Sequence, residues 1–302
     1  MMIRTIPVGM LIALGAASGA SAQTCAGSPV AVQILGSGNP AANPERASSG
    51  YLLWVGQQAK LMVDVGGGTY FRFSQSRAKL ADLAMLAISH LHPDHTSDLA
   101  ALMWGSNRQR SAVLPIVGPS GSNVAPDFAT FLHRQFDART GAFQVLGQIL
   151  GAEQPNSARP RLDISIVDVT KGEPTKVLDR DGIIVTAQGI PHSMPTLAYR
   201  VQTGNVSVVF SSDQNGTDPK FVDFAKGADV LIMHMNLPAG APLDPSHATP
   251  AVVGRVAQAT GVKRLIVSHI GPFNVDAAVA ELKQTYTGPL TVGADLQCTP
   301  VQ

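Results

Sequence analysis

The stretch AMLAISHLHPDHTSDL, residues 84–99, carries the strongest structural signal in this chain. Residues 84–89 form an almost uninterrupted apolar run of the length of a buried strand. Nitrogen and oxygen donors follow directly, at His90, His92, Asp94 and His95. In extended backbone the first two point the same way, and Pro93 bends the chain so that the next two can turn toward a second point. These subsets indicate ligands for two borderline metal ions.

A polar loop that carries histidines by accident is the alternative, but it leaves four polar side chains at a buried strand end without a purpose. The HxHxDH pattern resembles the signature of the metallo-β-lactamase superfamily, and the resemblance extends over residues 30–291. It implies an α+β fold, a four-layer αββα sandwich in which two mixed β-sheets are flanked by helices. One domain, residues 23–302, suffices.

Polar residues end four other strand-like runs, residues 60–65, 182–188, 206–210 and 264–268, in the positions that the superfamily motifs require. By the resemblance, Asp64 orients a ligand histidine from behind the metal site. Alternatively, it could satisfy backbone amides of the glycine turn at 66–68. The other three positions, His192, Asp213 and His269, are implied metal ligands.

The resemblance implies two divalent metal ions. The first takes His90, His92 and His192, the second takes Asp94, His95 and His269, and Asp213 is shared. Zinc is favoured, and iron and manganese remain alternatives because imidazole and carboxylate suit all three. A hydroxide held between two cations is the implied nucleophile, because metal binding lowers the pKa of water by many units.

Within the superfamily, the glycine loop at 36–40 and the Arg-Ala-Ser-Ser run at 46–49 resemble the ribonuclease Z branch. His234 stands where that branch has His-Glu-Ala-Thr, but Met235 replaces the glutamate. The resemblance implies that His234 faces the site without binding metal and protonates the leaving group; a buried structural histidine is the alternative. His247 begins a His-Ala-Thr run that resembles the branch's His-Ser-Thr, and could support His234 or cap a helix at 250–259. We count Asp94, His234 and His247 as the candidate catalytic residues.

The sequence favours a dinuclear metal-dependent hydrolase of a phosphodiester or related small ester. Lactonase, arylsulfatase and β-lactamase-type activity on the same site remain alternatives, and so does a metal-bearing binding protein without turnover. Residues 119–161 contain four Arg, no Lys and three acids. This is not a basic clamp for nucleic acid, so no transfer RNA is expected as a partner. The role of this segment and of His133 within it stays open, as does the oligomeric state, a homodimer included.

Residues 1–22 have the basic, apolar and small-residue regions of a cleavable secretory signal, which implies a secreted or periplasmic protein. No run is long enough for a membrane span. Without residues 1–22 the bases fall from 22 to 21 and equal the 21 acids, which argues against a polyanionic partner. The only two cysteines, Cys25 and Cys298, predict a disulfide; two free buried thiols are the alternative.

Apolar periodicity also predicts an amphipathic helix over residues 97–108. Residues 127–150 are expected to be helical, although their pattern is weak. Short strands are expected at 162–169, 176–178 and 230–233, the last of which is entirely apolar.

Overall fold

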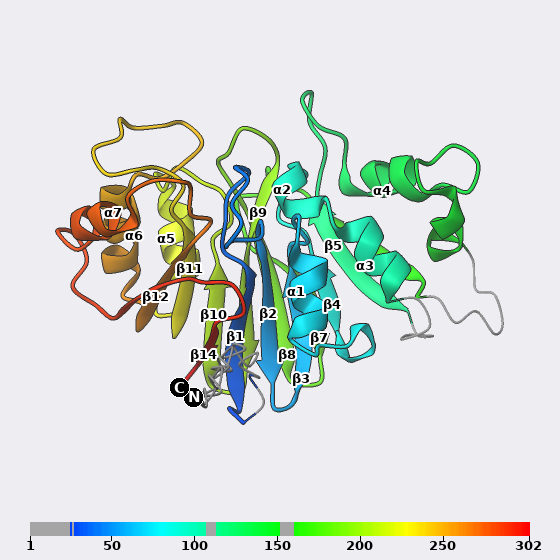
Figure 1. Cartoon of the computed structure of the whole chain (residues 1–302), viewed down its shortest axis with the longest axis horizontal. Helices are drawn as coiled ribbons and strands as arrows, with labels where there is room; N and C mark the ends of the chain where they lie inside the picture. Colours follow the sequence, from blue (N-terminus) through cyan, green and yellow to red (C-terminus); the bar gives the residue numbers. More distant parts are fainter. Residues whose placement is uncertain (1–24, 26, 107–112, 152–159) are drawn as a thin grey trace, which may run out of the picture.

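The computed structural model describes residues 25, 27–106, 113–151 and 160–302. The predicted signal segment, residues 1–22, lies outside these residues. Two seven-stranded sheets pack face to face, with helices on both outer faces (Figure 1). The predicted four-layer α+β sandwich is therefore confirmed.

The first sheet has the strand order β14-β1-β2-β3-β4-β5-β6 and is mixed, because the pairs from β14 to β3 are antiparallel and those from β3 to β6 are parallel. Its strands are β1 (Val30–Gly36), β2 (Gly50–Val55), β3 (Gln58–Val63), β4 (Met85–Ala87), β5 (Leu114–Pro119), β6 (Leu162–Val167) and β14 (Cys298–Pro300). The outer face is covered by α1 (Thr69–Gln75), α3 (Leu99–Gly105) and α4 (Phe128–Phe136), with short turns η1 (Leu80–Asp82) and α2 (Pro93–Thr96) between strands and helices.

The second sheet has the order β13-β12-β11-β10-β9-β8-β7 and is also mixed. Its strands are β7 (Thr175–Arg180), β8 (Ile183–Ile190), β9 (Thr196–Thr203), β10 (Val206–Phe210), β11 (Val230–His234), β12 (Arg264–Ser268) and β13 (Leu290–Val292). Its outer face is covered by α5 (Pro219–Ala225), α6 (Pro250–Thr260) and α7 (Val275–Leu282), on the side of the molecule opposite α1, α3 and α4 (Figure 1).

Side chains that alternate along each strand enter different cores. On β11, Val230 and Ile232 pack between the sheets, whereas Leu231 and Met233 pack against the outer helices. Strands that are covered on both faces read as continuous apolar runs instead of alternating ones. This explains why residues 84–89 and 230–233 show no period of two.

The helix predicted over residues 127–150 is interrupted. α4 ends at Phe136, and the 3₁₀ turn η2 (Gln144–Leu150) follows after a break. At the break the carboxylate of Asp137 accepts hydrogen bonds from the backbone amides of Arg139 and Thr140, both within 2.9 Å. Such local bonds compete with helical ones, and Asp favours turns for this reason. The helix predicted over 97–108 corresponds to α3, and residues 107–112 lie outside the described part.

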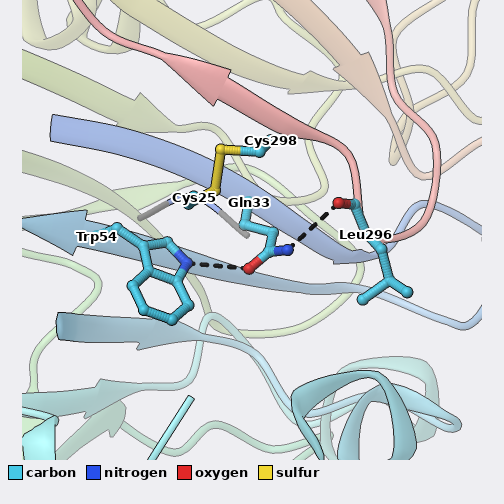
Figure 2. Close-up of a disulfide and its surroundings, with 5 residues drawn as sticks. All are labelled: Cys25, Gln33, Trp54, Leu296 and Cys298. Carbon is cyan, nitrogen blue, oxygen red and sulfur yellow. Dashed lines mark hydrogen bonds between the residues drawn. A yellow bond between two sulfur atoms is a disulfide. The ribbon is translucent and has the colours of Figure 1, made fainter. Parts of the chain in front are cut away.

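The two ends of the described chain are joined on the first sheet. β14 pairs with β1, and the predicted Cys25–Cys298 disulfide is present, with Cα atoms 5.6 Å apart (Figure 2). Beside it, Gln33 of β1 donates to the carbonyl of Leu296 and accepts from the indole of Trp54. Among the described helices none has the length and apolar character needed to cross a bilayer.

Replacing both cysteines by serine is expected to destabilise the protein. The bridge spans 273 residues, and the chain-entropy model gives about 5–6 kcal/mol as an upper figure for a loop of this length. Denaturant unfolding of the Cys25→Ser, Cys298→Ser double variant would measure the loss. Peptide mapping of unreduced protein from an oxidising compartment should show the linked peptides, and two alkylatable thiols in such material would exclude the bridge.

Candidate metal centre

All seven predicted ligands meet at one edge of the sandwich, where strands of both sheets end. From the first sheet, His90 and His92 follow β4, and Asp94 and His95 lie on the short helix α2. From the second sheet, the remaining ligands follow β8, β10 and β12, at His192, Asp213 and His269. Side chains from two separate sheets thus form one buried cluster.

The first group of donor atoms contains His90, His92, His192 and Asp213, as predicted. The Nδ1 atom of His92 lies 3.0 Å from Nε2 of His90 and 3.4 Å from Nε2 of His192. The Oδ2 atom of Asp213 lies 3.8 Å and 3.7 Å from the same two Nε2 atoms. Four donors therefore surround one small volume.

The second group contains His95, Asp213 and His269, again as predicted. The Nε2 atoms of His95 and His269 are 3.4 Å apart, and the Oδ2 atom of Asp94 lies 3.5 Å and 3.1 Å from them. Asp213 approaches this group with both oxygens, Oδ1 at 3.4 Å from His269 and Oδ2 at 3.7 Å from His95. The donor atoms that all lie within 4.8 Å of one another are those of His95, Asp213, His269 and His234; Asp94, which the sequence had placed in this group, is not among them.

Hydrogen bonds on the outer side of the rings fix which nitrogens carry protons. His192 Nδ1 lies 3.0 Å from the carbonyl of Ser246, and His95 Nδ1 lies 2.8 Å from the carboxylate of Asp64. Each of these nitrogens must donate, so in the neutral rings each Nε2 presents a lone pair to the cluster. In the neutral rings, lone pairs and carboxylate oxygens therefore face one another, an arrangement that needs a proton or a cation between them.

Cations between these donor atoms would remove the repulsion between the lone pairs and the carboxylate oxygens. Tetrahedral zinc holds nitrogen at about 2.0–2.1 Å, which places neighbouring ligand atoms roughly 3.3 Å apart. The separations given above between neighbouring donor atoms, 3.0–3.8 Å, bracket that value. The donor set fits two divalent ions that accept imidazole and carboxylate ligands.

Burial and neighbouring charges set the ionisation of these groups. Burial holds the pKa of His90 well below its usual value and lowers the pKa of His192 to about 4, which keeps both rings in the neutral, ligating form. Burial also acts on His95, but the Asp64 carboxylate outweighs it and raises the pKa to about 9. Burial alone would raise the pKa of Asp213; His269 and the hydrogen bond with His234 hold it well below its usual value, so Asp213 is ionised.

Asp64 holds its ligand histidine from behind, as the resemblance implied. Its carboxylate accepts from His95 and from both the backbone amide (2.7 Å) and the hydroxyl (2.8 Å) of Ser89. The alternative, bonding to amides of the glycine turn, is not what the structure shows. Such outer partners fix the tautomer and direction of a ligating ring.

Three non-glycine residues at this edge have left-handed backbone conformation. They are Asp64 (φ 60°), Ser212 (φ 54°) and His269 (φ 57°), and each stands at or beside a residue of the site. A non-glycine residue in this region costs roughly 1 kcal/mol or more and persists only where its surroundings fix it. Strain of this kind is concentrated at functional sites.

His234 lies in the cluster with both ring nitrogens engaged. Nδ1 is 2.5 Å from Oδ1 of Asp213, and Nε2 is 3.0 Å from the hydroxyl of Tyr51. The side chain is only 5% exposed. A ring with no free nitrogen and little access to solvent cannot easily reach a leaving group, so the predicted acid role of His234 does not fit this geometry.

His247 occupies the more open position. Its half-buried ring lies 5.2 Å from that of His192 and 6.2 Å from that of His269, centroid to centroid. In the described part of the chain no hydrogen bond holds its ring nitrogens. The cap of α6 is Thr249, whose hydroxyl accepts from the amide of Val252, so the proposal that His247 caps this helix is wrong. His133 is exposed on α4, and the structure assigns it no role.

Tyr51 was missed by the sequence reasoning. It lies in β2, within a run that reads as plain apolar strand, and only its hydroxyl marks it as different. The glycine loop at 36–40 also contributes, because Gly38 forms a β-bridge with Ile270, directly after the ligand His269. The amide of Ile270 donates to the carbonyl of Ser37 at 2.8 Å.

Comparison with known proteins identifies the family of this chain. The model of the beta-lactamase superfamily domain matches residues 63–270, which contain every proposed ligand. The chain belongs to this superfamily. This chain is 26% identical over 286 residues to ribonuclease Z of Mycobacterium bovis (strain BCG / Pasteur 1173P2). The match covers 88% of this chain and 96% of that protein. It therefore lies near the ribonuclease Z branch.

Solved structures share the fold of this superfamily member. Human tRNase Z, short form, superposes with a TM-score of 0.70 at 19% identity, over 90% of this chain and 99% of that one. The metallo-beta-lactamase fold protein YhfI from Bacillus subtilis gives 0.68 at 22% identity, with the same coverage. These likenesses confirm the two-sheet architecture.

Protein purified without chelator is expected to contain about two metal equivalents, one for each donor group. His92→Ala removes a donor from the first group only and should lose at least one equivalent while the second group keeps its ion. Elemental analysis after gel filtration measures this. Near-normal metal content in His92→Ala would contradict the assignment of the first group.

Proposed function

We propose that this protein is an exported hydrolase that uses two divalent metal ions, most simply zinc, to cleave a small phosphodiester or a related ester. The observation that carries the proposal is the pair of donor groups that share the carboxylate of Asp213. When bound, such ions supply a water of lowered pKa and neutralise charge on the oxygens of the reacting group. Neither cysteine is free to act as a nucleophile, because both lie in the disulfide.

The residues of the chain have separable tasks. Asp64 holds His95 in the ligating tautomer, and Asp213 provides the negative charge between the two groups. Asp94 adds a second carboxylate at the edge of the cluster, with its Oδ2 atom 3.1 Å from Nε2 of His269. Fixed groups of this kind need no rearrangement as charge develops on the substrate.

His247 is the better placed of the two candidate proton donors. It stands beside His192 and His269, has only part of its ring buried, and keeps both ring nitrogens available among the described residues. Departure of an alkoxide needs a proton, and a protonated imidazole can give one. Burial lowers the pKa of His247, so the share of rings that carry this proton grows as the pH falls. We assign this step to His247 and a different role to His234.

Ester cleavage at phosphorus is favoured over the other options by kinship with ribonuclease Z, whose name denotes phosphodiester cleavage in RNA. Transfer RNA itself is a poor candidate here. The chain without residues 1–22 has equal numbers of acids and bases, and residues 119–161 contain four Arg, no Lys and three acids. Phosphate-rich RNA requires many cationic contacts, so we propose a small substrate.

The test is a substrate panel with zinc-loaded protein that lacks residues 1–22. It comprises an aryl phosphodiester, an alkyl phosphodiester, a sulfate ester, a lactone, a β-lactam and a precursor transfer RNA, each with a chelator-treated control. Chelator-sensitive turnover that is highest on the phosphodiesters supports the proposal. Highest turnover on another class would reassign the substrate, and no turnover by protein holding two metal ions would favour a binding protein.

Export is a separate part of the proposal and rests on residues 1–22 and on the disulfide. Fractionation of cells that express the full chain tests it. Recovery of a shortened, disulfide-bonded protein outside the cytoplasm is expected.

A further inference from the structure

Tyr51 connects the two sheets directly beneath the metal centre. It belongs to β2 of the first sheet, is 1% exposed, and packs against Phe210 of β10 with ring centroids 5.8 Å apart. Its hydroxyl lies 3.0 Å from Nε2 of His234 and 3.0 Å from Oγ of Ser268. A tyrosine of one sheet thus meets the ends of β11 and β12 in the other.

The imidazole of His234 continues this contact to the shared carboxylate. Its Nδ1 atom lies 2.5 Å from Oδ1 of Asp213, while its ring stacks on that of His269 with centroids 4.6 Å apart. Stacking and two hydrogen bonds leave the ring a single orientation. Asp213 Oδ2 faces the other way, toward His90, His95 and His192 at 3.7–3.8 Å.

Asp213, the acceptor at the end of the series Tyr51, His234 and Asp213, determines which of these atoms carry protons. The carboxylate of Asp213 can only accept, so Nδ1 of His234 donates to it and Nε2 keeps its lone pair. The hydroxyl of Tyr51 lies 3.0 Å from this lone pair and 3.0 Å from Oγ of Ser268, so both acceptors are within reach of its single proton. Burial raises the pKa of Tyr51 above its usual range, so this hydroxyl keeps its proton.

We propose that Tyr51 and His234 are positioning residues that hold the carboxylate of Asp213 in the orientation needed to bridge two metal ions. The inference rests on the proposed dinuclear site but adds a role that the ligand set does not require. It also explains why His234 is buried and paired. The competing assignment makes His234 itself a ligand of the second ion, which its distances allow.

Zinc affinity measured by competition with a chromophoric chelator tests the inference without any substrate. Tyr51→Phe keeps the ring and removes only the hydroxyl, and zinc binding is expected to weaken by about 10-fold, at the low end for outer-sphere partners. His234→Ala should weaken it by about 10–100-fold. The matched control is Tyr199→Phe, another fully buried tyrosine, whose hydroxyl donates to the carbonyl of Ile88 and contacts no ligand. It should bind zinc like the wild type.

His234→Asn separates positioning from ligation. The asparagine amide nitrogen can take the place of Nδ1 and donate to Asp213, but an amide is a poor zinc ligand. If His234→Asn recovers most of the zinc affinity that His234→Ala loses, the positioning role is supported. If His234→Asn binds zinc as weakly as His234→Ala, the proposal is overturned in favour of a ligand role. Wild-type affinity in Tyr51→Phe would also overturn it. A wild-type protein that fails to bind two zinc ions would instead overturn the proposed function.

Thermal unfolding of the metal-free variants tests whether a zinc defect arises only from a general loss of stability. Tyr51→Phe loses the hydroxyl contacts with His234 and Ser268, and Tyr199→Phe loses the bond to the carbonyl of Ile88, so both variants should be destabilised, Tyr51→Phe at least as much as Tyr199→Phe. A zinc defect confined to Tyr51→Phe then reflects the metal centre. Equal zinc defects in both variants would show that general loosening of the core is the cause and would overturn the inference.

Discussion

The Asp213→Asn protein is expected to lose both metal ions and nearly all hydrolytic activity. The carboxylate stands in both donor groups, with Oδ2 within 3.8 Å of three ligand imidazoles and Oδ1 at 3.4 Å from His269. An amide of the same shape cannot supply the negative charge between two cations. We expect metal content to fall from about two equivalents to well below one, and turnover by at least about 10³-fold.

The control for this variant is Asp229→Asn. Asp229 is also a buried carboxylate of the second sheet, but it accepts from the amide of Ser207 and pairs with Lys263, away from the cluster. This variant should lose stability and keep its metal. An Asp213→Asn protein that still holds two ions would show that the histidines alone suffice and that the shared carboxylate has been misassigned.

His247→Ala is expected to slow hydrolysis of esters with poor leaving groups by about 10²-fold or more. The proposed task of His247 is to protonate a departing alkoxide, and an acidic phenol leaves without that help. The deficit should therefore shrink on an aryl ester of an acidic phenol. Steady-state kinetics on an alkyl and a nitrophenyl phosphodiester measure the difference, with metal content verified in each preparation.

His133→Ala serves as the companion variant, because His133 is exposed on α4 and lies outside the cluster. It should behave as wild type on both substrates. Equal losses on both substrates in His247→Ala, with metal retained, would mean that this histidine binds substrate and does not donate the proton.

That the proposed ligands lie together has a physical reason. Each ligand follows a short apolar strand, and the ends of neighbouring strands meet at one edge of a sheet. The choice of His192, Asp213 and His269 among the polar residues at such strand ends came from the family resemblance. The long apolar runs were equally clear, because strands covered on both faces need apolar residues at every position. The α+β layering followed from these runs and from the family resemblance.

What the sequence could not supply depends on contacts between distant segments. The partner of His234 is Tyr51, 183 residues away on the other sheet, and only the packing of the sandwich places them together. The separate positions of His234 and His247 likewise depend on how the segment before α6 returns to the site. The break after Phe136 has a local cause, the turn made by Asp137, but a weak apolar pattern concealed it.

The division of each donor group between the two sheets has a consequence for how the protein matures. Each donor group takes some of its ligands from each half of the sandwich, so full coordination of either ion requires that one half has docked on the other. Binding and folding are then thermodynamically linked, and an ion present at 100 times its Kd would add about 2.7 kcal/mol to the stability of the docked state. Metal supply in the compartment where the chain folds would therefore govern how long the finished molecule survives, quite apart from any reaction it performs.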